Sequence, residues 1–443
     1  MEGAMSPISR TIAASWPPVL VYLILVLSIF LGDRSLSAPQ HDQDRFHYQV
    51  VRQFDANWPA MDITNYGTAT GPGYHYVMAS VSQVIGHDLV GLRLVSMIFG
   101  ACLLVGVAGW CATMVSVRAA AFLTMPLAAS IYVVGSGLYV HTDNFGWMLV
   151  VFLLGPLVFM LLRPVDYLAT GFLALVAVSV RQIFIWTIGP LILAGVLSSP
   201  IVRRLPERLR GSDLDENASW KPLVTAVLCS VPAVVLLLVF IGTWGGLVPP
   251  RFQTLHASNF SLCAYGYGLA VVALYAPFFL LMVPAPGALL KADRGWIVLF
   301  VVIGAVLSLV GPSSADFAEG RHGGPVWMLV EHGPVIGDRS VVLAIMSAFG
   351  AGALALLVSA AVRNGRGLPA LVLLCAWVAS TATQLVNTQT FQRYFDTPGL
   401  LLLCWLGALV LAGRDDSEQR TAVGPPLLAV VLSLLLFATV VNT

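Results

Sequence analysis

The chain alternates long apolar runs with short polar stretches. A helix needs about 20 mainly apolar residues to cross a bilayer, and runs of this kind predict about thirteen membrane helices, within a range of roughly 11 to 14. Their expected bounds are 16–32, 88–114, 119–137, 143–162, 166–180, 183–198, 222–242, 264–284, 296–311, 340–362, 368–386, 397–412 and 425–441. The pattern therefore predicts an all-α polytopic membrane protein with a single transmembrane domain over residues 1–443. The two short runs on either side of Arg181 can also be read as one long tilted helix.

The composition supports a membrane protein and excludes other classes. Hydrophobic residues make up 58% of the chain and charged residues only 10%, against roughly a quarter charged in soluble domains. Lysine occurs only at positions 221 and 291 and the net charge is +1, so no clustered cationic surface for nucleic acid is expected. The six cysteines lie singly, without the spacing of a metal site, and are expected to be small core residues.

Basic residues predict the orientation of the chain in the membrane. With the N-terminus in the cytoplasm, fourteen of the 23 basic residues fall on the cytoplasmic side, as the positive-inside rule requires. All 8 histidines then fall on the outer side. Because the charge of histidine is readily tuned near neutral pH, this distribution indicates ligand binding or chemistry at the outer face, although ordinary loop composition also explains it. Scarce lysine with abundant alanine, valine and arginine favours a bacterial inner (plasma) membrane, and the endoplasmic reticulum membrane is expected in a eukaryote.

The first outer loop, residues 33–87, is unusually polar for this chain. Asp44, His47, Val51 and Phe54 follow one another at helical spacing, which predicts a short amphipathic helix on the membrane surface, with Asp44 and His47 on one face. A Gly-Pro-Gly turn and an apolar segment too short to cross the membrane come next. They predict a second interfacial helix before the spanning run that begins near residue 88.

Carboxylates at a membrane surface have two physical uses. In a transporter they couple ions or protons and lie within a spanning helix near the midplane of the bilayer. In an enzyme that acts on a hydroxyl, a carboxylate serves as general base and lies in a loop or interfacial helix that faces a cavity. The apolar runs of this chain are nearly free of acids, which favours the enzyme. The alternative is a multi-pass secondary transporter or flippase for a polar or lipid-linked solute.

The outer segments resemble those of a known family of enzymes. "DRFHYQ", the segment from Trp58 to Asp62, "TATGPGYHY", "VSVRQIFIW" and "FQRYF" occur in this order between residues 42 and 396. This order is similar to that of the GT-C membrane glycosyltransferases, which use polyprenyl-phosphate sugars. Within them it most resembles the dolichyl-phosphate-glucose-dependent alpha-1,2-glucosyltransferases.

The sequence departs from that family at two places. The family usually has Asp-Glu before Phe-His, whereas this chain has Gln43 and Asp44, with Asp42 one place earlier. Gly71 and Pro72 stand where the family has two prolines. The resemblance implies a GT-C fold and the transfer of a hexose from a polyprenyl- or dolichyl-phosphate carrier. The acceptor would be a hydroxyl of a glycan or lipid-linked molecule on the outer or lumenal face, with membrane lipid as a further partner.

Such a transfer requires a base for the acceptor proton. A single inverting displacement needs one carboxylate, because the phosphate is already a good leaving group. Asp44 is the first choice for this base and Asp42 the second, and a solvated loop acid is the alternative for either.

The departing phosphate requires cations, and guanidinium groups bind phosphate oxygens in two-pronged fashion. Arg393, and Arg321 with His322, lie where outer loops meet helices, although Arg393 can instead anchor the chain at the interface. Arg181 lies deeper, where an unpaired charge costs roughly 2.5 to 3.5 kcal/mol, so it is expected to have a partner, either an acid or the ligand. The second outer loop, 312–339, is expected to contact donor or acceptor.

Further candidates for binding the sugar or the acceptor come from the same outer segments. His47 can assist the base or bind hydroxyls, and aromatic rings can stack on sugars, although aromatic belts are common at membrane interfaces. Asp143 can also be read as the N-cap of the next helix. The full set of substrate-binding candidates is His47, Trp58, Asp62, Tyr74, His75 and Asp143.

No cofactor is expected. Imidazole and carboxylate groups suit several divalent ions, so a metal site in the first outer loop is chemically possible. Its ligands would be His41, Asp42, Asp44 and His47. Their spacing is not diagnostic of a metal, and the resemblance favours a metal-independent mechanism.

Overall fold

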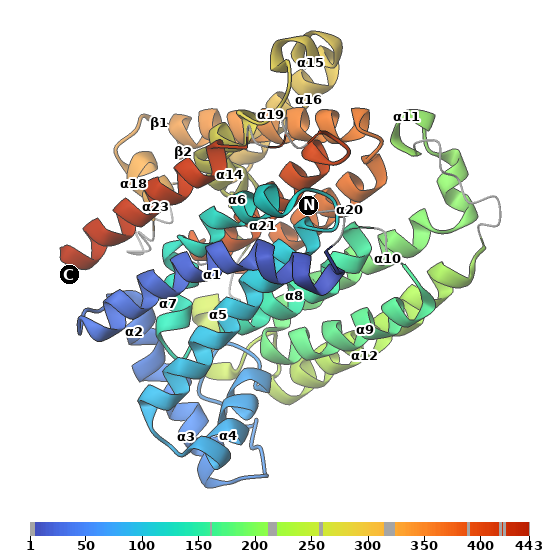
Figure 1. Ribbon diagram of the computed structural model, residues 1–443. Coiled ribbons are helices and arrows are strands. Elements are labelled where there is room, and N and C mark those ends of the chain that lie inside the picture. Colours follow the sequence, from blue (N-terminus) through green and yellow to red (C-terminus); the bar gives the residue numbers. More distant parts are fainter. Residues whose placement is uncertain are drawn as a thin grey trace.

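The computed structural model is an assembly of helices that describes residues 5–159, 162–210, 219–256, 260–313, 324–387, 390–415, 419 and 422–442 (Figure 1). In these residues, seven helices are long and apolar enough to cross a membrane. They are α1 (Pro7–Leu31), α5 (Leu89–Cys111), α12 (Lys221–Trp244), α19 (Val341–Arg363), α20 (Gly367–Gln384), α21 (Arg393–Leu411) and α23 (Gly424–Val441). The prediction of an all-α polytopic membrane protein is confirmed.

Bent and shorter apolar helices complete the bundle. The pair α6 (Val117–Ala128) and α7 (Ile131–Leu138) is bent by 70°, and the pair α15 (Pro286–Ala292) and α16 (Arg294–Leu309) by 89°. Counting each bent pair as one span raises the number of candidate spans in the described residues to nine. The shorter apolar helices are α8 (Thr142–Val158), α9 (Pro164–Val180), η3 (Gln182–Thr187) with α10 (Ile188–Leu197), and α14 (Ala264–Leu280). Each predicted apolar run is therefore helical, but the count of thirteen spans is not confirmed.

Helix α21 runs through the middle of the bundle and is buried along its whole apolar length. It contacts α14, α20, α6 and α19. Close packing of small residues brings its neighbours together: a Cβ added to Gly350 on α19 would lie 2.0 Å from the carbonyl oxygen of Leu269 on α14. α21 begins at Arg393 and is buried from Tyr394 onward. The guanidinium of Arg393 therefore lies at the start of a buried helix.

The first outer loop folds into helices, as predicted. α2 (Ser37–Asp42), a π-helical turn η2 (Gln43–His47) and α3 (Tyr48–Ala56) follow one another without a break, and α4 (Gly73–Ile85) packs against α3. Figure 1 shows α3 and α4 at one end of the molecule. The position of these helices at a membrane surface stays a prediction.

Short elements connect the remaining helices. They are η4 (Pro200–Arg204), α11 (Glu207–Arg210), η5 (Pro250–Phe252), α13 (Gln253–His256), α18 (Pro325–Glu331) and the antiparallel strands β1 (Val335–Ile336) and β2 (Arg339–Ser340). The last three belong to the second outer loop of the sequence prediction.

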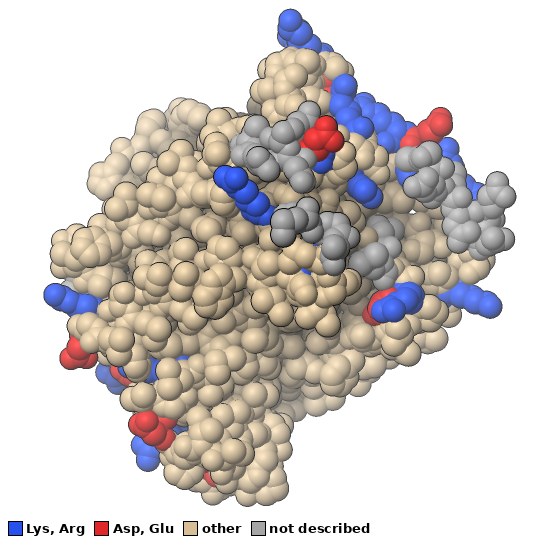
Figure 2. Space-filling view, viewed as in Figure 1, with Lys and Arg blue, Asp and Glu red and all other residues tan. Residues whose placement is uncertain are grey.

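Charge is distributed unevenly over the ends of the molecule. In the view of Figure 2, Lys and Arg side chains gather at the end that holds α11 and α15, opposite α3 and α4. At that end Asp293 is buried and bridges Arg208 (2.5 Å) and Arg363 (3.2 Å). This basic end is the one that the positive-inside rule assigns to the cytoplasm. The orientation of the chain in the membrane stays a prediction.

Candidate functional site

A π-helical turn decides which side chains of the first outer loop face the interior. The amide of Tyr48 donates to the carbonyl oxygen of Gln43, five residues earlier, so the chain turns less per residue here than in an α-helix. Gln43 and His47, four residues apart, are both buried, whereas Asp44 is exposed. The prediction that Asp44 and His47 share one face was therefore wrong, because it assumed α-helical geometry.

Gln43 fixes this turn to the rest of the protein. Its Oε1 accepts hydrogen bonds from Arg93 Nε on α5 (3.0 Å) and from the amide of Val140 (3.1 Å). Its Nε2 donates to Asp44 (2.8 Å). Since Gln43 is fully buried, these bonds hold η2 against α5 and the segment before α8. Asp42, the residue before Gln43, thereby faces the interior of the bundle.

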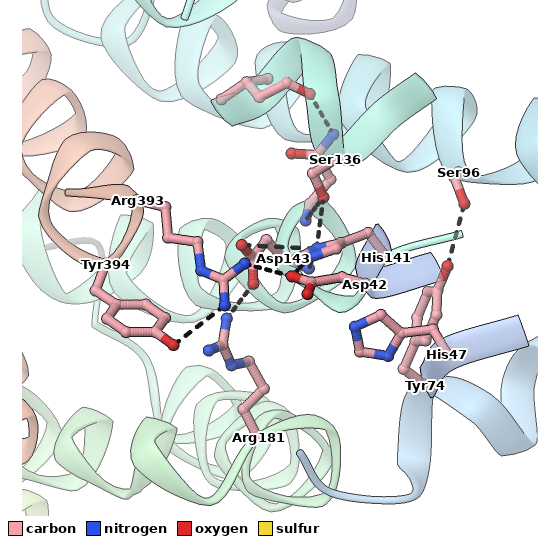
Figure 3. A network of polar contacts seen from close by, with 12 residues as sticks. Asp42, His47, Tyr74, Ser96, Ser136, His141, Asp143, Arg181, Arg393 and Tyr394 are labelled. Carbon is pink, nitrogen blue, oxygen red and sulfur yellow. Dashed lines mark hydrogen bonds and ion pairs between the residues drawn. The ribbon is translucent and has the colours of Figure 1, made fainter. Parts of the chain in front are cut away.

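Asp42 lies between a guanidinium and an imidazole (Figure 3). Its Oδ2 accepts from Nη1 of Arg393 at 2.5 Å and lies 3.6 Å from Nε2 of His141. Burial opposes the charge of Asp42, but the contact with His141 and the positive charge of Arg393 outweigh burial and hold the pKa of this carboxyl well below its usual range. Asp42 is therefore an ionised carboxylate at neutral pH.

His141 is the N-cap of α8. Its Nδ1 accepts a hydrogen bond from the amide of Asp143 (3.3 Å), so in the neutral ring the proton resides on Nε2, which points to Asp42. Asp143 itself lies in the first turn of α8. The reading of Asp143 as the N-cap was therefore wrong, because the helix starts at Thr142, two residues earlier than that reading requires.

The sequence predicted that Arg181 has a partner because it lies deep among apolar residues, and this partner is an acid. It pairs with Asp143, and both side chains are 12% exposed. α9 ends where Arg181 adopts an extended conformation, so the two short runs of the sequence are separate helices with Arg181 at the break. Its guanidinium carbon lies 5.5 Å from the centre of the Tyr394 ring. Arg393 donates to the hydroxyl of the same Tyr394 (3.3 Å), which brings the two guanidinium groups to one tyrosine.

The Gly-Pro-Gly turn packs against the break between α9 and η3. The amide of Gly71 donates to the carbonyl oxygen of Val180 (2.9 Å). A Cβ on Gly71 would lie 2.2 Å from the carbonyl oxygen of Ser179, and one on Gly73 would lie 2.2 Å from the Ser179 hydroxyl. Only glycine permits this approach, so the turn ties the first outer loop to the end of α9 beside Arg181.

A cavity of about 770 Å³ opens beside these charged groups. Asp42, Arg181 and Arg393 lie next to one another in its wall, which is otherwise mainly apolar (Figure 3). The apolar wall includes Phe46, Ile183, Ile185, Leu237, Leu247, Val248, Phe252, Val386 and Phe391. Arg393 Nε and the side-chain amide nitrogen of Gln182 are buried donors with no hydrogen-bond partner among the described residues. The cavity therefore combines a mainly apolar wall with one strongly polar region, and that region contains hydrogen-bond donors that a ligand could use.

Several predicted residues lie away from this cavity. Asp44 is exposed and does not line it. Trp58 packs on Tyr76, with ring centres 4.7 Å apart, and Asp62 is exposed and accepts from the hydroxyl of Thr64 (2.6 Å). These three residues are not brought together with Asp42.

Tyr74 and His75 are buried below the cavity wall. Tyr74 is fully buried and its hydroxyl bonds to Ser96 (3.1 Å), so its ring cannot stack on a sugar as predicted. His75 is fully buried and contacts His47, which does line the cavity. Arg321 and His322 lie outside the described residues. Among the residues that are described, no group of three or more His, Cys, Asp or Glu side chains is arranged to hold a metal ion.

Three residues of this site were not among the sequence candidates. His141 stands in the segment "YVHTDNFGW" and Tyr394 in the motif "FQRYF", but nothing in their spacing distinguished them from their neighbours. Histidine is not among the preferred N-cap residues, so no capping signal in the sequence selected His141. Gln182 directly follows Arg181 in sequence, and its role depends on the helix break.

The fold and site define an all-α polytopic membrane protein with a polar centre in a mainly apolar cavity. No protein-family model matches the chain, and no curated protein matches it. Two solved structures of ArnT from Cupriavidus metallidurans are similar to it. The one bound to undecaprenyl phosphate has 12% identity and a TM-score of 0.39, over 92% of this chain and 78% of that chain. The apo state has 14% identity and a TM-score of 0.37 over the same shares. No functional conclusion follows from likeness at this level.

Proposed function

We propose that this protein is a GT-C membrane glycosyltransferase that moves a hexose from a polyprenyl-phosphate carrier to an acceptor hydroxyl. The observation that carries the proposal is the juxtaposition of Asp42, Arg181 and Arg393 in the wall of a mainly apolar cavity. Ligand pockets generally combine an apolar volume with a few placed polar groups, and this volume lies within their usual size. The resemblance of the outer motifs to the GT-C family supports the same reading.

The donor phosphate would bind at the two arginines. In the part of the chain that the structure describes, Arg393 Nε and the side-chain amide of Gln182 are buried donors without acceptors, and buried donors normally have a partner. Phosphate oxygens would supply these acceptors, and guanidinium groups favour them geometrically. The apolar wall would hold the first isoprene units of the carrier.

Asp42, not Asp44, would be the base. Asp42 lines the cavity and is ionised, whereas Asp44 is exposed and lies outside it. In a single inverting displacement the acceptor oxygen forms a bond to the anomeric carbon. The bond from that carbon to the phosphate oxygen breaks with its electron pair on the phosphate, and the acceptor proton passes to Asp42. Developing charge on the phosphate would be held by Arg393 and Arg181.

The pairing of Asp42 with Arg393 would make the base dependent on the donor. A carboxylate paired with a guanidinium is a weak base, because the positive charge stabilises its ionised form. A phosphate that engages Arg393 would weaken this pairing and raise the basicity of Asp42. The base would then be strongest when donor is bound, which favours transfer to the acceptor.

The finer assignments follow from the resemblance. Glucose on a dolichyl or other polyprenyl phosphate is the first donor to test, with a glycan or lipid-linked acceptor. The reaction would occur on the outer or lumenal face, in a bacterial inner membrane or the endoplasmic reticulum membrane. A metal-independent mechanism predicts that a chelator leaves transfer unchanged.

A secondary transporter or flippase is the second candidate. Asp396 on α21 is 2% exposed and accepts from Ser130 (2.6 Å) and from the Tyr275 hydroxyl, so one buried acid lies within the bundle. The bend between α6 and α7 also falls beside it, and broken helices with buried acids are features of transporters. This candidate predicts movement of an intact solute across the membrane.

One experiment separates the two candidates. The purified protein in lipid nanodiscs would be incubated with a panel of radiolabelled polyprenyl-phosphate hexoses and a mixture of glycan acceptors, with and without chelator. The proposal expects one donor to be consumed and its label to appear on an acceptor. Recovery of every donor intact, together with translocation of a donor in sealed vesicles, would contradict glycosyl transfer and support the transporter.

A further inference from the structure

Behind Asp42 a line of buried polar side chains leads away from the cavity. His47 Nδ1 lies 2.9 Å from His75 Nε2, and His75 Nδ1 lies 2.6 Å from the hydroxyl of Tyr66. The Tyr66 hydroxyl also lies 2.8 Å from the carbonyl oxygen of Gly71. His47 and Tyr66 are less than a tenth exposed and His75 is fully buried, so these contacts are not exchanged with bulk water.

The direction of each hydrogen bond in this line follows from its last group, the carbonyl oxygen of Gly71. A carbonyl oxygen can only accept, so the Tyr66 hydroxyl must donate its single proton to Gly71. The Tyr66 oxygen therefore accepts from His75, which places a proton on His75 Nδ1. Burial lowers the pKa of His75 to about 3, so its ring is neutral at pH 7 and Nε2 is a bare acceptor. His47 must then carry its proton on Nδ1 to donate to His75.

The remaining nitrogen of His47 is thereby fixed as an acceptor. Burial also lowers the pKa of His47 well below its usual value, so the ring carries one proton and Nε2 keeps its lone pair. Within the described part of the chain, Nε2 of His47 makes no hydrogen bond, and His47 lines the cavity beside Asp42. His141, whose ring centre lies 5.0 Å from that of His47, presents the opposite atom, a protonated Nε2.

We propose that Tyr66 and His75 are positioning residues that hold His47 in its Nδ1-protonated tautomer, so that Nε2 accepts a hydrogen bond from an acceptor hydroxyl next to the one that reacts. The role towards an acceptor rests on the proposed function. A hydroxyl that donates to Nε2 is held with its oxygen lone pairs directed away from His47. Orientation of this kind lowers the entropy that the transfer step must lose. The neighbouring hydroxyl, which reacts, gives its own proton to Asp42 when the new bond forms.

The tautomers can be measured without any substrate. Nitrogen-15 NMR of the full chain with labelled histidine, in nanodiscs at pH 7, would report the protonated nitrogen of each ring, with His47→Gln used for assignment. We expect Nδ1-protonated rings at His47 and His75. A proton on Nε2 of His47 in the unmodified protein would overturn the proposal, whatever the substrate is.

Tyr66→Phe tests the positioning. It removes one of the two acceptors of the His75 Nδ1 proton and leaves the carbonyl oxygen of Gly71. With that proton less firmly held, the two histidines can reverse their bond, and His47 gains protonation at Nε2. We expect kcat/KM for the acceptor to fall about tenfold, which corresponds to about 1.4 kcal/mol, with the KM for donor unchanged. Tyr74→Phe is the matched control, because it removes a buried tyrosine hydroxyl bonded to Ser96 outside this line. It should keep both tautomers and activity within twofold.

The outcomes separate this proposal from the proposed function. Transfer that is active and equal in Tyr66→Phe and the unmodified protein would overturn the positioning role. Absence of transfer from every labelled donor in the unmodified protein would overturn the proposed function and the role of Nε2 towards an acceptor. The tautomers measured by NMR would still decide whether Tyr66 and His75 fix the ring of His47.

Discussion

Asp42→Asn is the most direct perturbation of the proposed mechanism. The substitution keeps the size of the side chain and an oxygen that can accept from Arg393, but it removes the proton acceptor. A positioned general base contributes about 10²- to 10⁴-fold to rate, so we expect kcat to fall by that factor, equivalent to about 2.7 to 5.5 kcal/mol. Because Arg393 no longer faces a carboxylate at 2.5 Å, donor affinity should be unchanged or higher.

Single-turnover transfer with saturating labelled donor would measure the chemical step, and binding of a non-transferable donor analogue would measure affinity separately. Asp44→Asn is the matched control: the exposed neighbour should retain full kcat. Turnover by Asp42→Asn within threefold of the unmodified protein would refute the assignment of the base. A loss explained entirely by weaker donor binding would instead make Asp42 a group that positions Arg393.

Three further predictions follow from the site and its supports. Arg393→Gln should raise the Kd for donor about 10- to 100-fold, because charged hydrogen bonds to phosphate are lost, and equal affinity in a binding titration would remove Arg393 from the phosphate site. Gly71→Ala should lower thermal stability by about 1 to 3 kcal/mol, because its Cβ meets Ser179, whereas Gly242→Ala, with no atom within 4 Å, should not. Since the folded-state pKa of His75 is about 3, its neutral ring favours folding above pH 6.5, and stability should fall by about 2 kcal/mol between pH 6.5 and 5. His75→Phe should flatten this pH dependence of the unfolding temperature.

The helices could be predicted from the sequence because apolar length is a local property. Every predicted run is helical, including both runs beside Arg181. The need of Arg181 for a partner followed from the cost of an unpaired charge among apolar residues, but the choice between an acid and the ligand did not. The number of spans did not follow, because bends such as that between α6 and α7 depend on how each helix packs against its neighbours.

The choice between Asp42 and Asp44 could not be made from spacing. It depends on the π-helical turn, in which one backbone bond from Tyr48 to Gln43 rotates the following side chains away from their α-helical directions. That turn is held by Gln43, which bonds to residues 50 and 97 positions further along the chain. Long-range contacts of this kind leave no periodic signal. In the sequence, the exposed Asp44 therefore looked equivalent to Asp42, the half-buried partner of Arg393.

The same contacts explain why the charged centre can exist inside an apolar bundle. Asp42 comes from the first outer loop, His141 and Asp143 from the start of α8, Arg181 from the end of α9 and Arg393 from the start of α21. Each lies at a helix end or break, where backbone groups and neighbouring side chains offset the cost of burying charge. Two carboxylates face two guanidinium groups, so the charges of these four side chains balance. A phosphate would add negative charge to it, and the lasting consequence would be a weaker hold of Arg393 on Asp42. In the proposed mechanism, the coupling of donor binding to base strength would therefore follow from charge balance.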